Sequence, residues 1–185
     1  MAEQKRLWER GWTIGTATQA TAVKRKSAGA PQLCTLNVFL TDGPMTKAFA
    51  GKEISRTIQM RGDQTLQALH RAIFKALDRE EEHLHEFNFG KGPYDRNGPR
   101  YTLASNMKDF MTDDVTAGDV AKTTLDSLNL GVGRAFGYWF DFGDDWRHEI
   151  RVEAIEEAPP QGRFPRVTAR VGDSPPQYAD PEELE

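Results

Sequence analysis

The chain has 185 residues, one cysteine and a formal net charge of −4. This length suits one ordinary domain with some chain to spare at its ends. The negative charge argues against a general nucleic-acid binder, which usually carries a basic surface. Cys34 has no partner for an internal disulfide bond, and no apolar run approaches the roughly 18 residues that a membrane-spanning helix needs. Because the N-terminus also lacks the apolar stretch of a signal peptide, we expect a cytoplasmic protein without a membrane partner.

Residues 1–31 are expected to form an N-terminal extension ahead of the core. The segment is basic overall, and residues 13–22 are small and polar without a helical period. Trp8 and Trp12 lie one helical turn apart, which allows a short helix that docks its two indoles on the domain. We favour a flexible or docked extension over an arm that binds a partner or nucleic acid, because such chain ends are common.

The first half of the core predicts two strands followed by a helix. Leu33–Leu40 and Ile54–Met60 alternate with the period of strands and together suggest a wide hairpin. A helix is expected from residue 62 to about residue 77, with His70 on its flank at the surface. Either Asp63 or Thr65 can serve as its N-cap. Its apolar stripe consists of Leu66, Leu69, Ile73, Ala76 and Leu77.

An acidic run at residues 78–86 contains two histidines, and a third strand is expected at residues 87–89. His83 and His85 lie two positions apart, so in a strand they point to the same face and present two imidazoles to one ion. With the carboxylates of a later turn nearby, this spacing suggests a mixed nitrogen–oxygen site for Zn²⁺, Mn²⁺ or Fe²⁺. The alternative, which we favour, is a solvated acidic segment with His85 packed on an aromatic ring.

The stretch Tyr138–Glu153 predicts a β-hairpin around which the rest of the chain is organised. Gly143 and the two aspartates after it have the chemistry of a turn. Beyond it, one face is apolar apart from His148 and the other is fully charged. We expect His148 to be a core histidine with a satisfied hydrogen bond rather than a metal ligand. The apolar face consists of Trp146, His148, Ile150 and Val152.

Three aspartates gather at the tip of this hairpin, and two interpretations stay open. Carboxylate oxygens suit a divalent cation, whereas Asp is also simply a good turn residue, which is the interpretation we favour. The candidate functional patch is His83, His85, Asp141, Asp144, Asp145, Trp146 and His148, and the metal ligands within it would be His83, His85, Asp141 and Asp144.

These motifs resemble the plasmid pRiA4b ORF-3-like family. Its typical signature, Y-x-Y-D-F-G-D-x-W-x-H, is similar to residues 138–148, with Phe140 in place of a Tyr. The family's H-L-H-x-F segment corresponds to residues 83–87, and its Y-P-R…P-P segment to residues 164–166 and 175–176. Val167 and Thr168 stand where many members carry a Cys. The resemblance implies no established activity; some members are described as insertion-element passenger proteins, which implies a link to plasmids or mobile elements.

The element order predicts an α+β domain: a mostly antiparallel sheet with one main helix packed on a face and a second short helix at residues 120–128. A β-grasp arrangement fits the first half. We divide the chain into the extension at 1–31, the core at 32–158 and a Pro-rich segment at 159–185. The density of prolines in that last segment predicts an irregular wrap followed by an acidic tail.

Three candidate functions remain from the sequence. The first, which we favour, is a non-enzymatic binding or accessory module with a protein partner and no cofactor, because no phosphate-binding loop and no nucleophile–base spacing is visible. The second is a metal-dependent hydrolase built on the histidines and aspartates above, in which the metal lowers the pKa of a bound water. A DNA-acting accessory protein ranks last, since the chain is acidic.

Overall fold

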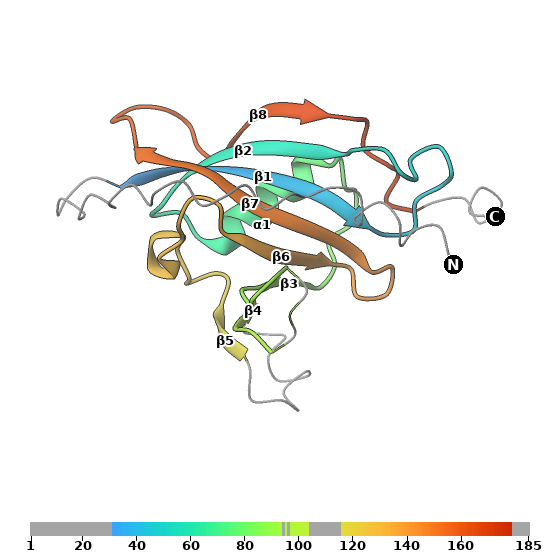
Figure 1. The fold of residues 1–185 in the computed structure, drawn as a ribbon, viewed down its shortest axis with the longest axis horizontal. Coiled ribbons are helices and arrows are strands. Elements are labelled where there is room, and N and C mark those ends of the chain that lie inside the picture. The colour runs from blue at the N-terminus through green and yellow to red at the C-terminus, as the bar shows by residue number, and fades with distance from the viewer. Residues whose placement is uncertain (1–30, 94, 96, 104–115, 179–185) are drawn as a thin grey trace, which may run out of the picture.

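The computed structural model describes residues 31–93, 95, 97–103 and 116–178, so the expectations for residues 1–30 lie outside it. The described strands form one eight-stranded sheet in the order β5-β4-β3-β6-β7-β1-β2-β8 (Figure 1). Every neighbouring pair is antiparallel except β4 and β5, which are parallel. The strands are β1 Gln32–Asp42, β2 Ser55–Arg61, β3 His85–Asn88, β4 Arg100–Thr102, β5 Thr116–Asp119, β6 Ala135–Phe140, β7 Trp146–Glu157 and β8 Arg166–Val171.

Strand β1 lies near the middle of the sheet, and its alternating pattern explains this place. Leu36, Val38 and Leu40 are buried on one face, and the strand pairs along its length with β2 on one side and β7 on the other. The wide β1–β2 hairpin expected from the sequence is confirmed.

One α-helix, α1 Leu66–Ala76, covers the face of the sheet that holds the core (Figure 1). Thr65 caps it by accepting a hydrogen bond from the Ala68 amide, as expected for a helix N-cap. The apolar stripe of the helix packs on the strands, with Leu66, Leu69 and Ile73 essentially inaccessible to solvent. The main helix is therefore confirmed, and its amphipathic face sets the inner face of the sheet.

The expected α+β class, with two helices and a β-grasp-like arrangement, is wrong. The described chain is mainly β: a mixed sheet of eight strands with one α-helix. The predicted helix at residues 120–128 is replaced by a turn and one short 3₁₀ segment, Asp126–Leu128. The backbone hydrogen bonds explain this. The amides of Leu125 and Asp126 donate to the carbonyls of residues 64 and 62, just before α1, and not to carbonyls one helical turn earlier in their own segment.

The Pro-rich segment was expected to be irregular, but part of it forms β8 at the edge of the sheet. Strand β8 pairs with β2 through contacts that include Ile58 opposite Val167. Buried Arg56 on β2 then fixes the chain that follows, donating to the carbonyls of Val171 and Gly172 and to the Ser174 hydroxyl. Residues 172–178, which we call the C-terminal strap, run on to the loop after α1. No helix in the described residues is long and apolar enough to cross a membrane.

Candidate functional site

The expected hairpin is formed by β6 and β7, and its turn uses the aspartates structurally. Asp141 and Asp145 both have positive φ, and the Asp145 amide donates to the Asp141 carbonyl at 2.7 Å. The Asp141 carboxylate accepts from the amides of Gly143 and Asp144, while Asp145 pairs with Arg147 at 2.9 Å. These contacts agree with the turn interpretation of the acidic tip.

Beneath this turn, between α1 and the sheet, lies a cluster of buried polar side chains. Its first part is a hydrogen-bonded chain in which His70 Nε2 lies 2.9 Å from the Glu82 carboxylate and His70 Nδ1 lies 2.8 Å from the Tyr138 hydroxyl. Because a carboxylate only accepts, Nε2 carries the proton and Nδ1 accepts from the hydroxyl. Burial lowers the pKa of His70, although its bond to Glu82 opposes the shift. The chain thus joins a buried phenol to a carboxylate that reaches solvent.

The expectation that His70 lies at the surface is wrong: its side chain is fully buried. Its ring stacks on that of His85, with centroids 3.6 Å apart and planes 3° from parallel. The interpretation that His85 packs on an aromatic ring is therefore confirmed. Neither ring nitrogen of His85 has a hydrogen-bond partner in the described chain. Burial, followed by the neighbouring His70, lowers the pKa of His85 to about 3, so both stacked imidazoles are neutral at physiological pH.

His148 completes the imidazole group from strand β7. It is a core histidine, as expected, and its Nδ1 lies 3.3 Å from the Tyr138 carbonyl, which requires the proton on Nδ1. Nε2 then has a free lone pair and no partner in the described residues. Burial, reinforced by the charge of Arg79, lowers the pKa of His148 to about 3.

Arg79 and Trp146 form the floor of the cluster toward the C-terminal strap. The Arg79 guanidinium lies 3.7 Å above the centre of the Trp146 ring, in cation–π geometry. Its Nη1 donates to the Pro175 carbonyl of the strap at 3.4 Å, and burial lowers the pKa of Arg79 to about 10. Gly43 also packs closely on the indole, since a Cβ at this position would come within 2.3 Å of the ring.

His83 lies at the rim of the cluster, not inside it. Its Nε2 is 2.8 Å from the Tyr178 hydroxyl of the strap and 3.5 Å from an Asp141 carboxylate oxygen. His85, two positions further, is turned inward, so the two histidines do not converge on one point with the aspartates. In the part of the chain that the structure describes, no three His, Cys, Asp or Glu side chains are grouped closely enough to hold a metal ion.

The seven residues of the candidate patch therefore divide among three places. Trp146, His148 and His85 belong to the buried cluster. The cluster also contains His70, Tyr138 and Arg79, which the sequence analysis did not include in the patch. At the rim are His83 and Asp141, and half-buried on the turn are Asp144 and Asp145. One signal in the sequence could have marked His70 as a core residue: it directly follows Leu69 of the predicted apolar stripe.

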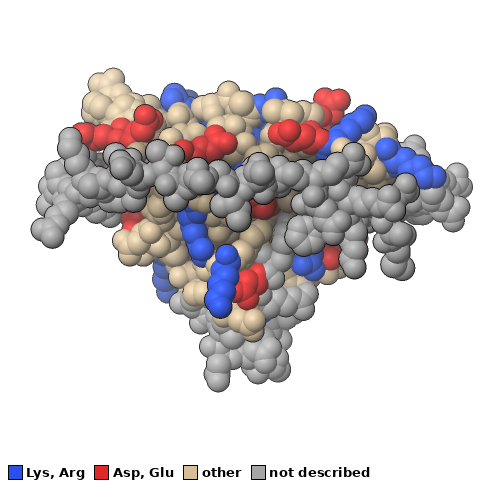
Figure 2. Space-filling model, viewed as in Figure 1, with Lys and Arg blue, Asp and Glu red and all other residues tan. Residues whose placement is uncertain are grey.

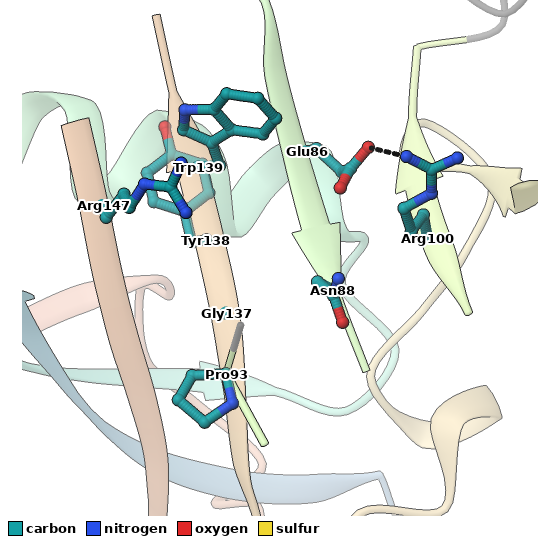
Figure 3. Close-up of a pocket in the computed structure, with 8 residues that line it drawn as sticks. All are labelled: Glu86, Asn88, Pro93, Arg100, Gly137, Tyr138, Trp139 and Arg147. Carbon is teal, nitrogen blue, oxygen red and sulfur yellow. Dashed lines mark ion pairs between the residues drawn. The ribbon is translucent and has the colours of Figure 1, made fainter. Parts of the chain in front are cut away.

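A pocket missed by sequence analysis lies on the opposite face of the sheet, which α1 does not cover (Figure 3). Two cross-strand rows form it: Glu86, Trp139 and Arg147 stand opposite one another on β3, β6 and β7, and the next row contains Arg100, Asn88 and Gly137. Its volume is about 90 Å³. We call it the outer pocket, and its lining residues are Glu86, Asn88, Pro93, Arg100, Gly137, Tyr138, Trp139 and Arg147.

The missing side chain of Gly137 lets the loop between β3 and β4 close over one end of this pocket. A Cβ at Gly137 would lie 1.9 Å from the Pro93 carbonyl oxygen, so the loop between β3 and β4 rests directly on the sheet at this position. Arg147 and Trp139 form one wall, with the guanidinium 5.2 Å from the indole centre. Glu86 and Arg100 form the other, with 3.8 Å between carboxylate oxygen and guanidinium nitrogen (Figure 3).

Comparison with known proteins supports the family resemblance and adds a structural relative. A family model described as "Plasmid pRiA4b ORF-3-like protein" matches residues 48–180. A crystal structure of a protein of unknown function from Methanosarcina mazei Go1 is similar, with a TM-score of 0.61 and 23% sequence identity over 80% of this chain and 75% of that one. At this identity the likeness concerns the fold. No match was found among curated proteins.

Proposed function

This chain belongs to the plasmid pRiA4b ORF-3-like family, and we propose that it is a non-enzymatic binding or accessory module whose outer pocket receives a side chain of a protein partner. The buried cluster gives little support to acid–base catalysis. His85 and His148 have pKa values near 3, and burial raises the pKa of the Tyr138 phenol well above its usual value. A general acid or base works best with a pKa near the ambient pH.

The observation that carries the proposal is the size and lining of the outer pocket. At about 90 Å³ it is several times smaller than the roughly 300–1,000 Å³ of typical cofactor and small-molecule sites. It has room for the end of one amino-acid side chain. Trp and Arg, which line one wall, are the residue types most enriched at the energetic centres of protein interfaces.

A protein partner suits the charge of this face better than nucleic acid does. Where described residues are visible, acidic and basic side chains are interspersed and do not form a patch of one sign (Figure 2). Nucleic-acid affinity depends on a concentration of basic groups that neutralise phosphates. The family description refers to a plasmid reading frame, and a partner encoded by a plasmid or mobile element is part of the proposal.

The test is whether the outer pocket takes up amino-acid side chains at all. The full chain, labelled with ¹⁵N, would be titrated with a panel of N-acetyl amino-acid methylamides at tens of millimolar, and indole N–H signals would be followed by NMR. The chain has four tryptophans, and Trp139→Phe assigns the signal of the pocket. Trp146 lies on the inner face of the sheet and is the internal control.

We expect at least one probe to shift the Trp139 signal in a saturable manner while leaving that of Trp146 in place. If no probe moves the Trp139 signal, the pocket is not an anchor site and the proposed function is wrong. If the Trp139 and Trp146 signals move together, the probes act on the whole fold, which also contradicts the proposal.

A further inference from the structure

We propose that the N-terminal extension docks an indole ring, that of Trp8 or Trp12, into an apolar groove at one end of the sheet. This groove is distinct from the outer pocket, and its volume is about 310 Å³. A cavity of roughly 150 Å³ holds benzene, so the groove has room for the larger indole. We call it the end groove, and its walls include Phe89, Pro99, Tyr101, Leu128, Leu130 and Arg134.

The walls of the end groove are apolar and partly open to solvent. Phe89 and Tyr101 meet edge to face, with ring centroids 5.4 Å apart, and Phe89 stacks on buried Phe136 at 4.5 Å. Leu128 and Leu130 are only partly buried, as are the rings of Phe89 and Tyr101. Aromatic rings favour edge-to-face and offset-stacked neighbours, so a wall that contains two rings suits a third.

The extension enters the fold beside this groove. It is followed by Gln32, the first residue of β1, whose carbonyl accepts from the Gly62 amide (Figure 1). The Gly62 carbonyl accepts in turn from the Asp126 amide, and a Cβ at Gly62 would lie 2.2 Å from the Asp126 carboxylate. The lining of the end groove begins at the next residue of the chain, Ser127. The entry point of the extension and the groove wall are therefore neighbours.

An occupant tethered in this way needs only modest affinity. Residues 13–30 join Trp12 to the entry point and span up to roughly 60 Å, so both indoles can reach the groove. A tether of this kind gives an effective concentration in the millimolar range. A contact of about millimolar affinity, too weak to capture a separate peptide at low concentration, is then about half occupied.

Charges at the entry point also favour the extension as the occupant. Glu156 and Glu157 end β7 and are exposed, and Glu157 lies opposite Gln32 in the sheet. The extension carries three consecutive basic residues at positions 24–26, close to that point along the chain. Opposite charges attract it toward this end of the sheet. Within the groove, Arg134 repels the basic side chains of the extension and can stack on an indole, so the groove selects tryptophan.

The test measures proximity in the full chain with a nitroxide spin label, which broadens the NMR signals of nearby protons. Ser127→Cys places the label at the end groove, and Lys52→Cys places it in the β1–β2 loop at the opposite end of β1. Cys34 does not compete for the label, because it is buried and burial raises its pKa to about 11. The readout is the indole N–H signals, which Trp8→Phe and Trp12→Phe assign.

We expect the label at position 127 to broaden the signal of Trp8 or Trp12, and the label at position 52 to leave both sharp. A groove variant then separates docking from the effect of the tether alone. Leu130→Lys places a charge in the apolar groove and should weaken docking at least about tenfold, which sharpens the broadened signal. Val132→Lys is the matched control and should preserve the broadening, because it adds the same charge on the same loop at a side chain already 65% exposed.

Equal broadening in the parent chain and in both lysine variants would overturn the proposal, since the tether alone would explain it. The indole signal of Trp146 reports whether Leu130→Lys remains folded.

The converse variant combines Trp8→Ala with Trp12→Ala and leaves every groove residue intact, so it tests the same contact even if Leu130→Lys does not fold. The backbone amide signals of residues 127–131 should shift in this variant, and those of residues 43–54 should not. Unchanged signals at residues 127–131 would contradict docking in the end groove.

Discussion

Acidification below neutral pH should destabilise this protein through its buried histidines. His85 and His148 have pKa values of about 3 in the folded state, against 6.5 for an unperturbed histidine, because both rings are buried. The unfolded chain therefore binds more protons than the folded one between these values. Stability is fully present above the unfolded pKa and falls as the pH drops below it.

The magnitude follows from linkage. Between about pH 7.5 and pH 5.5, one histidine that titrates at about 6.5 only when unfolded lowers the free energy of unfolding by about 1.4 kcal/mol. His85 and His148 together give nearly 3 kcal/mol on the same basis, and the lowered pKa of His70 adds in the same direction. This is a large part of the roughly 5–15 kcal/mol that holds an average domain together.

The assay is urea unfolding followed by fluorescence at several pH values in this range. Replacing His148 by Gln should reduce the slope of the unfolding free energy against pH by about a third to a half, whatever the variant does to stability at neutral pH. Asp63 and Asp95, whose pKa values are lowered, contribute only at more acidic pH. A change below about 1 kcal/mol across this range, or an unaltered slope in the variant, would refute the conclusion that these rings are buried and neutral.

Two other predictions concern the two faces of the sheet. Gly137→Ala should lower the free energy of unfolding by about 1–3 kcal/mol, because the new Cβ would lie 1.9 Å from the Pro93 carbonyl oxygen. The same substitution should close the outer pocket. Gly92→Ala is the control, since a Cβ at that position meets no atom within 4 Å. An equal effect of both substitutions would contradict the close approach. Elemental analysis of untagged protein, alongside His85→Ala and Asp144→Ala, should find no stoichiometric Zn, Mn or Fe; a metal bound by the parent chain and lost in both variants would restore the hydrolase reading.

Period-2 patterning predicted the central hairpin and the inner face of β7 because both are local properties of the sequence. The edge strands β5 and β8 escaped prediction for the opposite reason. Strand β5 has four residues and no apolar alternation, and β8 follows a proline-rich turn, so only the pairing with β4 and β2 reveals them. Missing these two strands is what made an α+β fold look more probable than a mainly β one.

The outer pocket and the buried cluster depend on strand register, which the sequence alone does not specify. Glu86, Trp139 and Arg147 are each ordinary outward-facing residues, and they become neighbours only because β6 pairs with β3 on one side and β7 on the other. Likewise, His70 met His85 only through the packing of α1 on β3. The family motif drew attention to His85, Trp146 and His148, but not to the helix and loop residues that surround them.

The middle of the sheet also determines when the chain can begin to fold. Strand β1 joins β7 through pairs such as Leu36 with Val152, which lie 116 positions apart. During synthesis, the edge of β1 that pairs with β7 stays unpaired until residues 146–157 have been made. Contacts of such long range slow folding and prolong the exposure of aggregation-prone strands. We therefore expect the sheet to close only after β7 has been synthesised, and a chaperone that shields the open edge of β1 would be of most use before that point.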